Sequence, residues 1–524
     1  MQLNDLPDEI LLLILKNLHN CEVLYSFHNI NQRFNRLIHD PIFTNRLNFV
    51  KWSCNKIVNK FSSNFIDQFT CLPILPEICK RIKWFNLESS FMTQFLSANK
   101  YSNLYGLGLY NINDEIINFL FTDKNLSSDI FKNQITSLVV GIDSEKKTSS
   151  IVENICNNLF TMMNNLIHLI FYDESYKNIV RFMTDVPSPK FSSSTLLTLN
   201  IKVQNFDDCL CMLDGRFNNL QSLYIDLIKI CSSSNQIKNQ GKIPNLKCFN
   251  LSCFLETWNY NELIVPLLHR MLNLEKLGLY ITIYVKERFI DRNNLKENIF
   301  NHLTKIKHFD FDIYSYIYME NQLKYPLKED IQQTFKDFPC RKIISCVDYI
   351  HNRKQAQYHI YSYPFLMKFY KQITNNFPGG FYPYVRQVSL YDKHPFEHEF
   401  FLRISLAFPL MTRLTLINYC SKNFKQSIDI NQNLEIIRYN HLIELEIRQC
   451  HDDYIEQFLL NTKTYLHNSI LLIIDLESLT RITQNFTRNE TRINCSKVNK
   501  LFLQGEYENL IQSLQNYFPL AEIC

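Results

Sequence analysis

The stretch Leu220-Gln221-Ser222-Leu223-Tyr224-Ile225 contains a pattern that returns along most of this chain. An apolar residue is followed by two spacers, a second apolar residue, one spacer and a third apolar residue. The last two apolar residues lie two positions apart, which is the period of a half-buried strand. Side chains on a strand point alternately to opposite faces, so Leu223 and Ile225 are expected to face inward and Tyr224 outward.

The same unit recurs in two series that a gap separates. Starts in the first series are 22 to 32 residues apart, and those in the second are 26 to 31 apart. One match is weak in a chain this apolar, but a near-constant period indicates an internal repeat. The copies begin at Ile82, Leu104, Ile135, Leu166, Leu196, Leu220, Leu246, Leu274 and Ile306, and then at Val385, Met411, Leu442, Leu471 and Val498.

Segments between these units have helical spacing. We expect helices over 151–163, 206–213, 263–272, 295–303, 396–408, 454–466 and 508–517. A strand followed by a helix, repeated every ~20–30 residues or slightly more, is typical of repeat architectures.

This pattern resembles a leucine-rich repeat. The resemblance implies an α/β solenoid over residues 81–524, with a parallel sheet on the concave face and helices on the convex face. The family's asparagine after the strand is mostly absent, and only Cys450, three residues after Ile447, occupies its place. Low glycine content favours helical returns between the strands.

The gap between the two series predicts an irregular insertion near 313–384. Residues 343–349 and 358–363 alternate like strands around a polar stretch, as in a hairpin or in two irregular repeats. We expect a helix near 365–377 and then a turn at Pro378-Gly379-Gly380. The segment is either a functional insertion or two diverged repeats.

The N-terminal stretch from Leu6 to Phe43 has a different pattern. Pro7 suits the first position of a helix, where its missing N–H costs nothing, and two acidic residues follow it at the positive helix end. Leu6, Ile10, Leu13, Ile14 and Leu18 form one stripe, while Leu11, Leu12 and Leu15 lie elsewhere on the circumference. Two short helices can hardly cover all of this apolar surface, so the sequence predicts a partner protein.

This region, residues 3–47, resembles an F-box, a module of roughly forty residues with three helices. In that family it docks a substrate receptor onto the adaptor of a cullin–RING ubiquitin ligase. One extra residue between Leu18 and Leu24, a missing terminal tryptophan and Ile30 in place of valine depart from the family pattern. The resemblance implies adaptor binding by Leu6, Pro7, Glu9, Ile10, Ile14, Leu18, Leu24 and Ile30. A helical cap on the next domain is the alternative. Residues 48–80 form a connecting segment without a Gly- or Ser-rich linker, which predicts a stiff junction.

Composition restricts the protein class. Hydrophobic residues at 46% and charged residues at 20% indicate a well-cored soluble protein. Net charge is +4 without a basic stripe, which argues against a nucleic-acid partner. Sixteen cysteines without framework spacing predict reduced thiols in the cytoplasm or nucleus. The N-terminal apolar run is too short to cross a bilayer, so no membrane association is expected.

Spacers within the repeats are expected on the concave face. Trp84 begins a row of aromatic residues there, and exposed aromatic side chains are favoured anchors in protein interfaces. Later strands place acidic residues against Arg413, Arg448 and Lys500, which predicts a net acidic surface for a basic or lysine-containing target. Target-binding candidates are Tyr110, Tyr172, Tyr224, Tyr280, Asp310, Asp312, Tyr391, Glu444 and Glu446.

One motif raises the alternative of an enzyme. His394-Pro395-Phe396-Glu397-His398 has the spacing of an inverted zinc-peptidase motif. Pro395 would displace His394 from the helix face of His398, and no third ligand is identifiable. Cys209-x-Cys211 lacks a second ligand pair and indicates core packing.

The two resemblances together imply the substrate receptor of an SCF-type ubiquitin ligase. Such a subunit is not an enzyme and needs no catalytic residues, metal or cofactor. Its expected partners are the adaptor, cullin through the adaptor, and a target protein that the sequence does not identify. An interaction scaffold without ubiquitin transfer and a zinc hydrolase are the alternatives.

Overall fold

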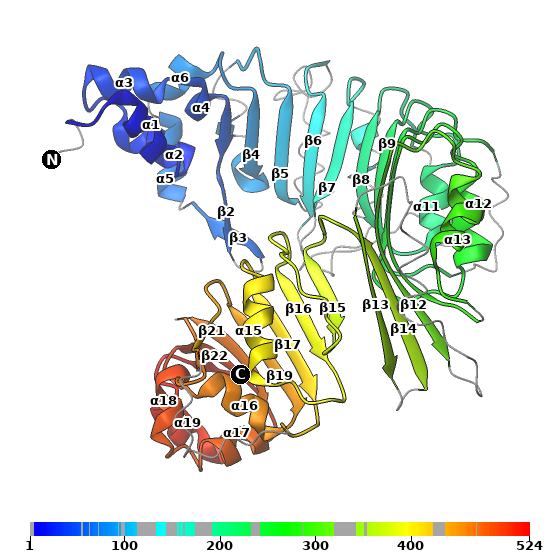
Figure 1. Ribbon diagram of the computed structural model, residues 1–524. Helices are drawn as coiled ribbons and strands as arrows, with labels where there is room; N and C mark the ends of the chain where they lie inside the picture. Colours follow the sequence, from blue (N-terminus) through cyan, green and yellow to red (C-terminus); the bar gives the residue numbers. More distant parts are fainter. Residues whose placement is uncertain are drawn as a thin grey trace. The chain divides into compact units, whose positions relative to one another are not determined.

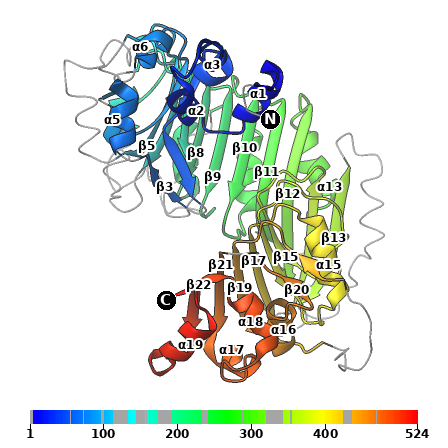
Figure 2. The same ribbon diagram turned by 90° about the vertical axis from the view of Figure 1, so that its left-hand side faces the viewer.

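The computed structural model shows a mixed α/β protein with short N-terminal helices and large, mostly parallel sheets (Figures 1 and 2). It describes residues 5–53, 56–61, 63–71, 73–92, 94–95, 100–112, 133–142, 155–156, 158–160, 163–172, 191–231, 241–286, 288–318, 342–350, 354–422, 435–467 and 469–524. These form two compact units, 1–284 with 292–313, and 285–291 with 314–524. Within the described residues, no helix is long and apolar enough to cross a membrane.

The first unit begins with four short helices that lead directly into a sheet. They are α1 (Asp8–Leu15), α2 (Asn20–Phe27), α3 (Gln32–Ile38) and α4 (Pro41–Thr44). Strand β1 (Arg46–Asn48) follows at once and pairs in parallel with β4 (Trp84–Glu88). Between them lie the antiparallel strands β2 (Val50–Ser53) and β3 (Lys56–Lys60) and the helices α5 (Ser63–Cys71) and α6 (Ile74–Ile78).

The sheet of the first unit then adds its strands in chain order. Each strand from β4 to β11 is parallel to the next one along the chain, and β12 follows β11 in the sheet order. The division between the units falls within β12. The strands are β5 (Gly106–Ile112), β6 (Ser137–Ile142), β7 (His168–Tyr172), β8 (Thr198–Val203), β9 (Ser222–Leu227), β10 (Cys248–Cys253), β11 (Lys276–Tyr284) and β12 (His308–Tyr318).

The helical segments that follow β8 in the first unit gather on one side of this sheet (Figure 1). They are α11 (Phe206–Met212), the π-helical turn Tyr260–Ile264 with α12 (Val265–Leu268), and α13 (Arg292–Leu295) with the π-helical turn Lys296–Phe300. These bounds confirm helical structure within the predicted segments 206–213, 263–272 and 295–303. The predicted helix 151–163 lies partly outside the described residues.

The second unit contains a hairpin and a seven-stranded sheet. Strands β13 (Ile343–Ile350) and β14 (Gln355–Ser362) pair antiparallel, as in a hairpin, which is one of the two alternatives that the sequence left open. The seven strands are parallel to one another and again follow chain order. They are β15 (Phe369–Ile373), β16 (Gln387–Tyr391), β17 (Arg413–Asn418), β19 (Glu444–Cys450), β21 (Ile470–Asp475), β22 (Val498–Gln504) and β23 (Glu522–Ile523).

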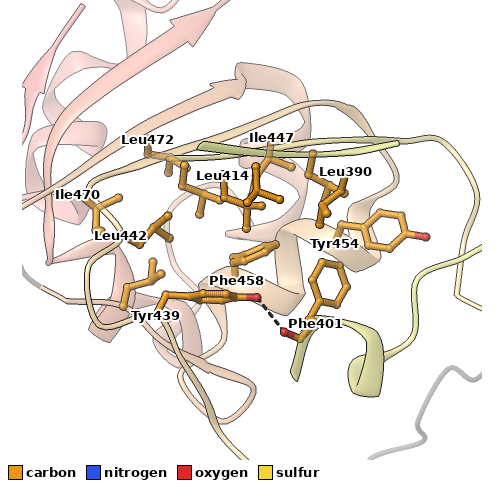
Figure 3. Packing of buried hydrophobic residues seen from close by; sticks show 14 of the residues in the cluster. Leu390, Phe401, Leu414, Tyr439, Leu442, Ile447, Tyr454, Phe458, Ile470 and Leu472 are labelled. Atoms are coloured by element: carbon orange, nitrogen blue, oxygen red, sulfur yellow. Dashed lines mark hydrogen bonds between the residues drawn. The ribbon is translucent and has the colours of Figure 1, made fainter. Parts of the chain in front are cut away.

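Helices cover one face of this seven-stranded sheet. They are α15 (His398–Ala407), α16 (Asp452–Leu459), α17 (Leu476–Ile482), α18 (Asn489–Cys495) and α19 (Ile511–Tyr517). Figure 3 shows the core between the two layers, where Leu390, Leu414 and Leu472 from strands face Phe401 of α15 and Phe458 of α16. The alternating apolar positions of each strand therefore pack against the helices, as their spacing predicts.

Two details of the second unit correct the sequence analysis. Residues 365–377 were expected to be helical, but strand β15 lies there. A register shift between Tyr370 and Ile373, with Gln372 at a positive φ of 51°, places two buried side chains three residues apart. A bulge thus imitates helical spacing. In β21, Leu472 and not Ile474 pairs with Leu445, so the predicted repeat Leu471-Ile474-Leu476 is two residues out of register.

Asparagine side chains join successive repeats of the first unit. In each case the residue just before the first apolar position donates a hydrogen bond to a backbone carbonyl of the preceding repeat. The bonds run from Asn103 to Lys80 at 2.6 Å, Asn165 to Asn133 at 2.8 Å, Asn219 to Ser194 at 2.7 Å, Asn245 to Asn218 at 2.7 Å, and Asn273 to Pro244 at 2.8 Å. These bonds satisfy carbonyls where the chain enters each strand.

In the second unit, side chains at the C-terminal ends of strands also contact backbone carbonyl oxygens. Asn418 Nδ2 donates to the carbonyl oxygen of His394 at 2.9 Å, and the Cys450 thiol lies 3.0 Å from the carbonyl oxygen of Leu416. Burial raises the pKa of Cys450 to about 12, so this thiol stays protonated and can donate. Cys450 therefore caps a strand end, at the position that the repeat pattern gives it.

Candidate interaction surfaces

Helix α1 presents an apolar side to solvent. Leu11 and Leu15 are 0% and 1% exposed, whereas Ile10 and Ile14 are 41% and 43% exposed and Leu13 is 60% exposed. Leu18, beyond the end of the helix, is 48% exposed. These four exposed residues have helical spacing and form the α1 face. A cluster of exposed apolar side chains on one helix marks an interaction site more often than scattered single residues do.

An ion-pair cluster anchors α1 to α3. Arg33 Nε donates a hydrogen bond to Asp8 Oδ1 at 2.7 Å, and Arg36 Nη2 donates to Asp8 Oδ2 at 2.7 Å. The hydrogen bond from Arg33 is the main cause of the lowered pKa of Asp8. Beside these pairs, Leu11 packs with Phe34 and Leu37 in a small core. The α1 face is thus held on a defined support.

The remaining N-terminal helices are tied to the sheet. Asn20 Nδ2 donates to the carbonyl oxygens of Ile42 and Arg46 at 3.2 and 3.0 Å, and the Cys21 thiol lies 3.3 Å from the carbonyl oxygen of Asn48. His39 Nε2 lies 3.1 Å from a Glu77 carboxylate oxygen. These contacts fix the helices relative to the first strands of the same unit.

The predicted adaptor-binding residues differ in their exposure. Pro7, Glu9 and Ile30 are exposed, like Ile10, Ile14 and Leu18, while Leu6 is half-buried. Leu24 is 0% exposed, so its prediction as a contact residue is wrong. Leu24 fills the core between the helices. An adaptor contact and a core position both require an apolar residue at that spacing, so the sequence could not distinguish them. Leu13 is the most exposed apolar residue of α1, and its place on the predicted stripe was the signal for it.

The aromatic row on the sheet of the first unit is buried where it begins. Trp84 and Tyr110 are 9% and 5% exposed and form a cluster with Val50 and Val139. The guanidinium carbon of Arg46 lies 4.9 Å from the centre of the Trp84 ring. The expectation that Trp84 and Tyr110 are exposed is therefore wrong, because neighbouring side chains cover them.

Further along this sheet the predicted residues are more accessible. Tyr224 is 36% exposed, and its hydroxyl lies 3.5 Å from the Cys248 thiol. This contact, together with partial burial, raises the pKa of Tyr224 to about 12. Tyr280 and Asp310 are half-buried, whereas Asp312 is buried. The side chain of Tyr172 lies outside the described residues.

On the sheet of the second unit, arginine side chains compensate the predicted acidic residues. Arg413 lies 3.3 Å from a Glu444 oxygen and 3.0 Å from a Glu446 oxygen, and Arg448 lies 3.3 Å from the other Glu446 oxygen. Burial raises the pKa of Glu444, although Arg413 opposes this effect. The guanidinium groups are the more exposed partners, so the predicted acidic surface is not found at these glutamates. Tyr391, at the end of β16, is half-buried.

The two histidines of the zinc-peptidase motif lie in different surroundings. His394 is exposed and precedes α15, while His398 is buried in its first turn. The ring nitrogens of His398 lie 2.9 Å from the carbonyl oxygen of Glu435 and 3.4 Å from the side-chain oxygen of Gln457. Both nitrogens thus face protein partners. Across the described residues, no cluster of three or more potential metal ligands is found.

A scan of the sequence against protein-family models found no match, and a search of curated proteins found none either.

Proposed function

We propose that this chain is the substrate-recognition subunit of an SCF-type E3 ubiquitin ligase. Residues 3–47 would act as an F-box that binds the adaptor, and the strand–helix units would form a leucine-rich repeat solenoid that binds the target. The observation that carries this proposal is the α1 face, whose Leu13 is 60% exposed while Leu11, on the opposite side of the helix, is buried.

The repeat units support the second half of the proposal. In each of the two compact units, parallel strands follow one another in the sheet in chain order. Side-chain ladders connect one repeat to the next, as between Asn245 and Asn218. In repeat proteins, the sheet face that the helices leave free serves as an extended binding surface.

The chain itself would perform no bond chemistry. Adaptor and target would be held by one molecule, which raises the effective concentration of a target lysine near the ubiquitin-charged enzyme. The firm attachment of α2 and α4 to β1 suits this role, because a stiff connection sets the distance between the two binding surfaces. Catalysis would belong to other subunits of the ligase.

Adaptor binding is best tested with point variants on the α1 face. Removing residues 1–46 would also remove Val23, Leu24 and Phe43, which are all 0% exposed, so a deletion would disturb the core. Leu13→Asp changes an exposed position and should weaken binding to the purified adaptor by about tenfold or more. The matched control is Leu520→Asp, since Leu520 is 67% exposed and lies far along the chain. Equal adaptor binding by both variants would overturn the proposal.

Target turnover separates a receptor from a scaffold. Proteins labelled by proximity in cells carrying the unmodified chain should be stabilised when Leu13→Asp replaces it. If adaptor binding is lost while the half-lives and ubiquitination of these proteins stay the same, the scaffold alternative is correct.

Metal analysis tests the zinc hydrolase. If the purified chain contains one equivalent of zinc and His398→Ala removes it, the result would support the enzyme.

A further inference from the structure

A groove lies in the second unit, where the end of α15 meets strand β18 (Ile437–Arg438). Its volume is about 640 Å³, and most of its lining is apolar. Leu406 is 67% exposed, Phe381 is 55% exposed and Ile436 is 42% exposed. A backbone hydrogen bond of 2.8 Å from Tyr382 to Ala407 fixes the Phe381 side of the groove against α15. We refer to this feature as the α15 groove.

One wall of the α15 groove is the edge of β18 that no described strand pairs with, which we call the open edge. Strand β18 pairs in parallel with β20 (Thr464–Tyr465), its one partner among the described residues. The Ile437 N–H donates to the carbonyl oxygen of Lys463 at 3.0 Å, so this residue faces β20. Backbone groups of successive residues in a strand point to opposite edges, which directs the peptide groups of Ile436 and Arg438 away from β20. Both residues line the groove.

The core below the groove holds this strand in place. Ile437 and Tyr439 are 0% and 4% exposed, and the Tyr439 hydroxyl donates to the carbonyl oxygen of Phe401 at 3.3 Å (Figure 3). Because these two side chains point inward, Ile436 and Arg438 point outward in the strand alternation. The open edge is therefore presented by a fixed backbone.

Charged residues mark the two ends of this strand segment. The Arg438 guanidinium carbon lies 5.2 Å from the centre of the Tyr465 ring, and Arg438 forms no ion pair in the described part of the chain. Glu435 lies three residues earlier, which is about 10 Å along an extended strand. A ligand running beside β18 would therefore meet a positive charge and a negative charge at separate points.

We propose that the α15 groove binds an extended peptide segment of a partner protein by adding it as a strand to the open edge of β18. Apolar side chains of the peptide would contact Phe381, Leu406 and Ile436. An acidic residue would lie beside Arg438, and a basic residue beside Glu435. Strand addition gives affinity through backbone hydrogen bonds and selectivity through the side chains that fit the pockets.

This site goes beyond the proposed ligase function, because peptide capture here needs neither the adaptor nor the α1 face. The experiment begins with a phage-displayed library of 12-residue peptides selected on the purified full-length chain. Selected peptides should share alternating apolar residues with an acidic residue at one end. Fluorescence anisotropy of labelled peptides then measures their Kd for each protein variant.

Two pairs of variants locate the site. Leu406→Asp should weaken peptide binding by about tenfold, while Leu520→Asp, at an equally exposed leucine, should leave it unchanged. Arg438→Glu should weaken binding similarly, and a peptide whose acidic residue is replaced by lysine should recover affinity for that variant. Arg492→Glu is the control, since Arg492 also lies over a tyrosine ring, Tyr517, but outside the groove.

Single N-methyl groups along a selected peptide test strand addition. Methylation should weaken binding at the residues whose N–H groups face Ile436 and Arg438 and be tolerated at the residues next to them, because neighbouring N–H groups of a strand point to opposite edges. Peptides that bind equally to Leu406→Asp and Leu520→Asp would overturn the proposal, and so would the absence of any selected consensus. A change from dimer to monomer in Leu406→Asp, measured by sedimentation, would instead identify the groove as a self-association surface.

Discussion

Arg33 and Asp8 form a close ion pair that connects the first helix to the third, with the guanidinium Nε 2.7 Å from the carboxylate. Arg33 also donates to the carbonyl oxygen of Leu6, so one side chain holds both the start of α1 and the chain two residues before it. Arg36 adds a second contact to Asp8 but is 73% exposed, against 32% for Arg33. The orientation of the α1 face thus depends mainly on Arg33.

Replacing Arg33 should therefore loosen α1 more than replacing Arg36. Arg33→Gln should increase amide hydrogen exchange across residues 8–15, with Arg36→Gln as the matched control. The lowered pKa of Asp8 means that its contribution is present above the unfolded-state pKa. That contribution is lost as pH falls through the folded-state pKa, so the protection factors of residues 8–15, which correct for the intrinsic pH dependence of exchange, should fall in acid. Equal protection in the two variants would contradict this view of Arg33.

Truncation of two leucines of α1 should change the free energy of unfolding by very different amounts. Leu11→Ala removes a fully buried side chain and should lower the free energy of unfolding by about 2–5 kcal/mol. Leu13→Ala changes a side chain that is 60% exposed and should shift it by at most about 0.5 kcal/mol. Urea denaturation followed by circular dichroism measures both values. A large loss in Leu13→Ala would mean that this residue supports the fold.

The strands were predictable because their buried side chains recur at fixed spacings. Leu223 and Ile225 are 0% and 2% exposed in β9, as the opening stretch of the sequence indicates. The prediction of a helix near 365–377 failed because a bulge places the buried residues Tyr370 and Ile373 three positions apart, which is also the spacing of a helix face. In the run Ile470–Asp475 nearly every residue is apolar, so the sequence alone could not select the register.

The candidate surfaces were predictable only where one element determines them. The α1 face follows from the helical period, which the sequence contains. The burial of Trp84 depends on Val50 and Arg46, which belong to other strands, and no local pattern could reveal that cover. The asparagine bonds were missed for a similar reason, since Asn245 identifies its acceptor only after the repeats are stacked.

The asparagine bonds between repeats should contribute measurable stability. Asn245→Ala leaves the carbonyl of Asn218 without its side-chain donor and should cost about 0.5–1.5 kcal/mol, since water can reach this exposed bond. Asn245→Asp should cost more at neutral pH, because an ionised carboxylate cannot donate a hydrogen bond. Protonation restores a donor, so this extra loss should shrink as pH falls. Chemical denaturation at pH 4 and pH 7 compares the variants, and a pH-independent difference between them would contradict the role of Asn245 as a donor.

Arg413 should matter most when Glu444 is ionised. Burial raises the pKa of Glu444, and Arg413 opposes this rise, so Arg413→Met should raise it further. A carboxyl group with a raised folded-state pKa stabilises the fold at low pH and loses that contribution as pH rises. Arg413→Met should therefore cost about 1–3 kcal/mol at pH 7.5 and less at pH 4.5. The double variant with Glu444→Gln should recover part of the loss at pH 7.5, and no recovery would show that Arg413 acts through other contacts.

Gly106 and Trp84 should show strong coupling. A Cβ atom at Gly106 would lie 1.9 Å from the Trp84 ring, so the indole covers the backbone of the neighbouring strand only because residue 106 has no side chain. Gly106→Ala should push the indole out of its buried cluster, lower stability by about 1–3 kcal/mol and shift tryptophan emission to longer wavelength. Trp84→Leu in the same chain should reduce the cost of Gly106→Ala, as a double-mutant cycle measures. Additive effects of the two substitutions would mean that the glycine serves the strand itself and not the ring that lies over it.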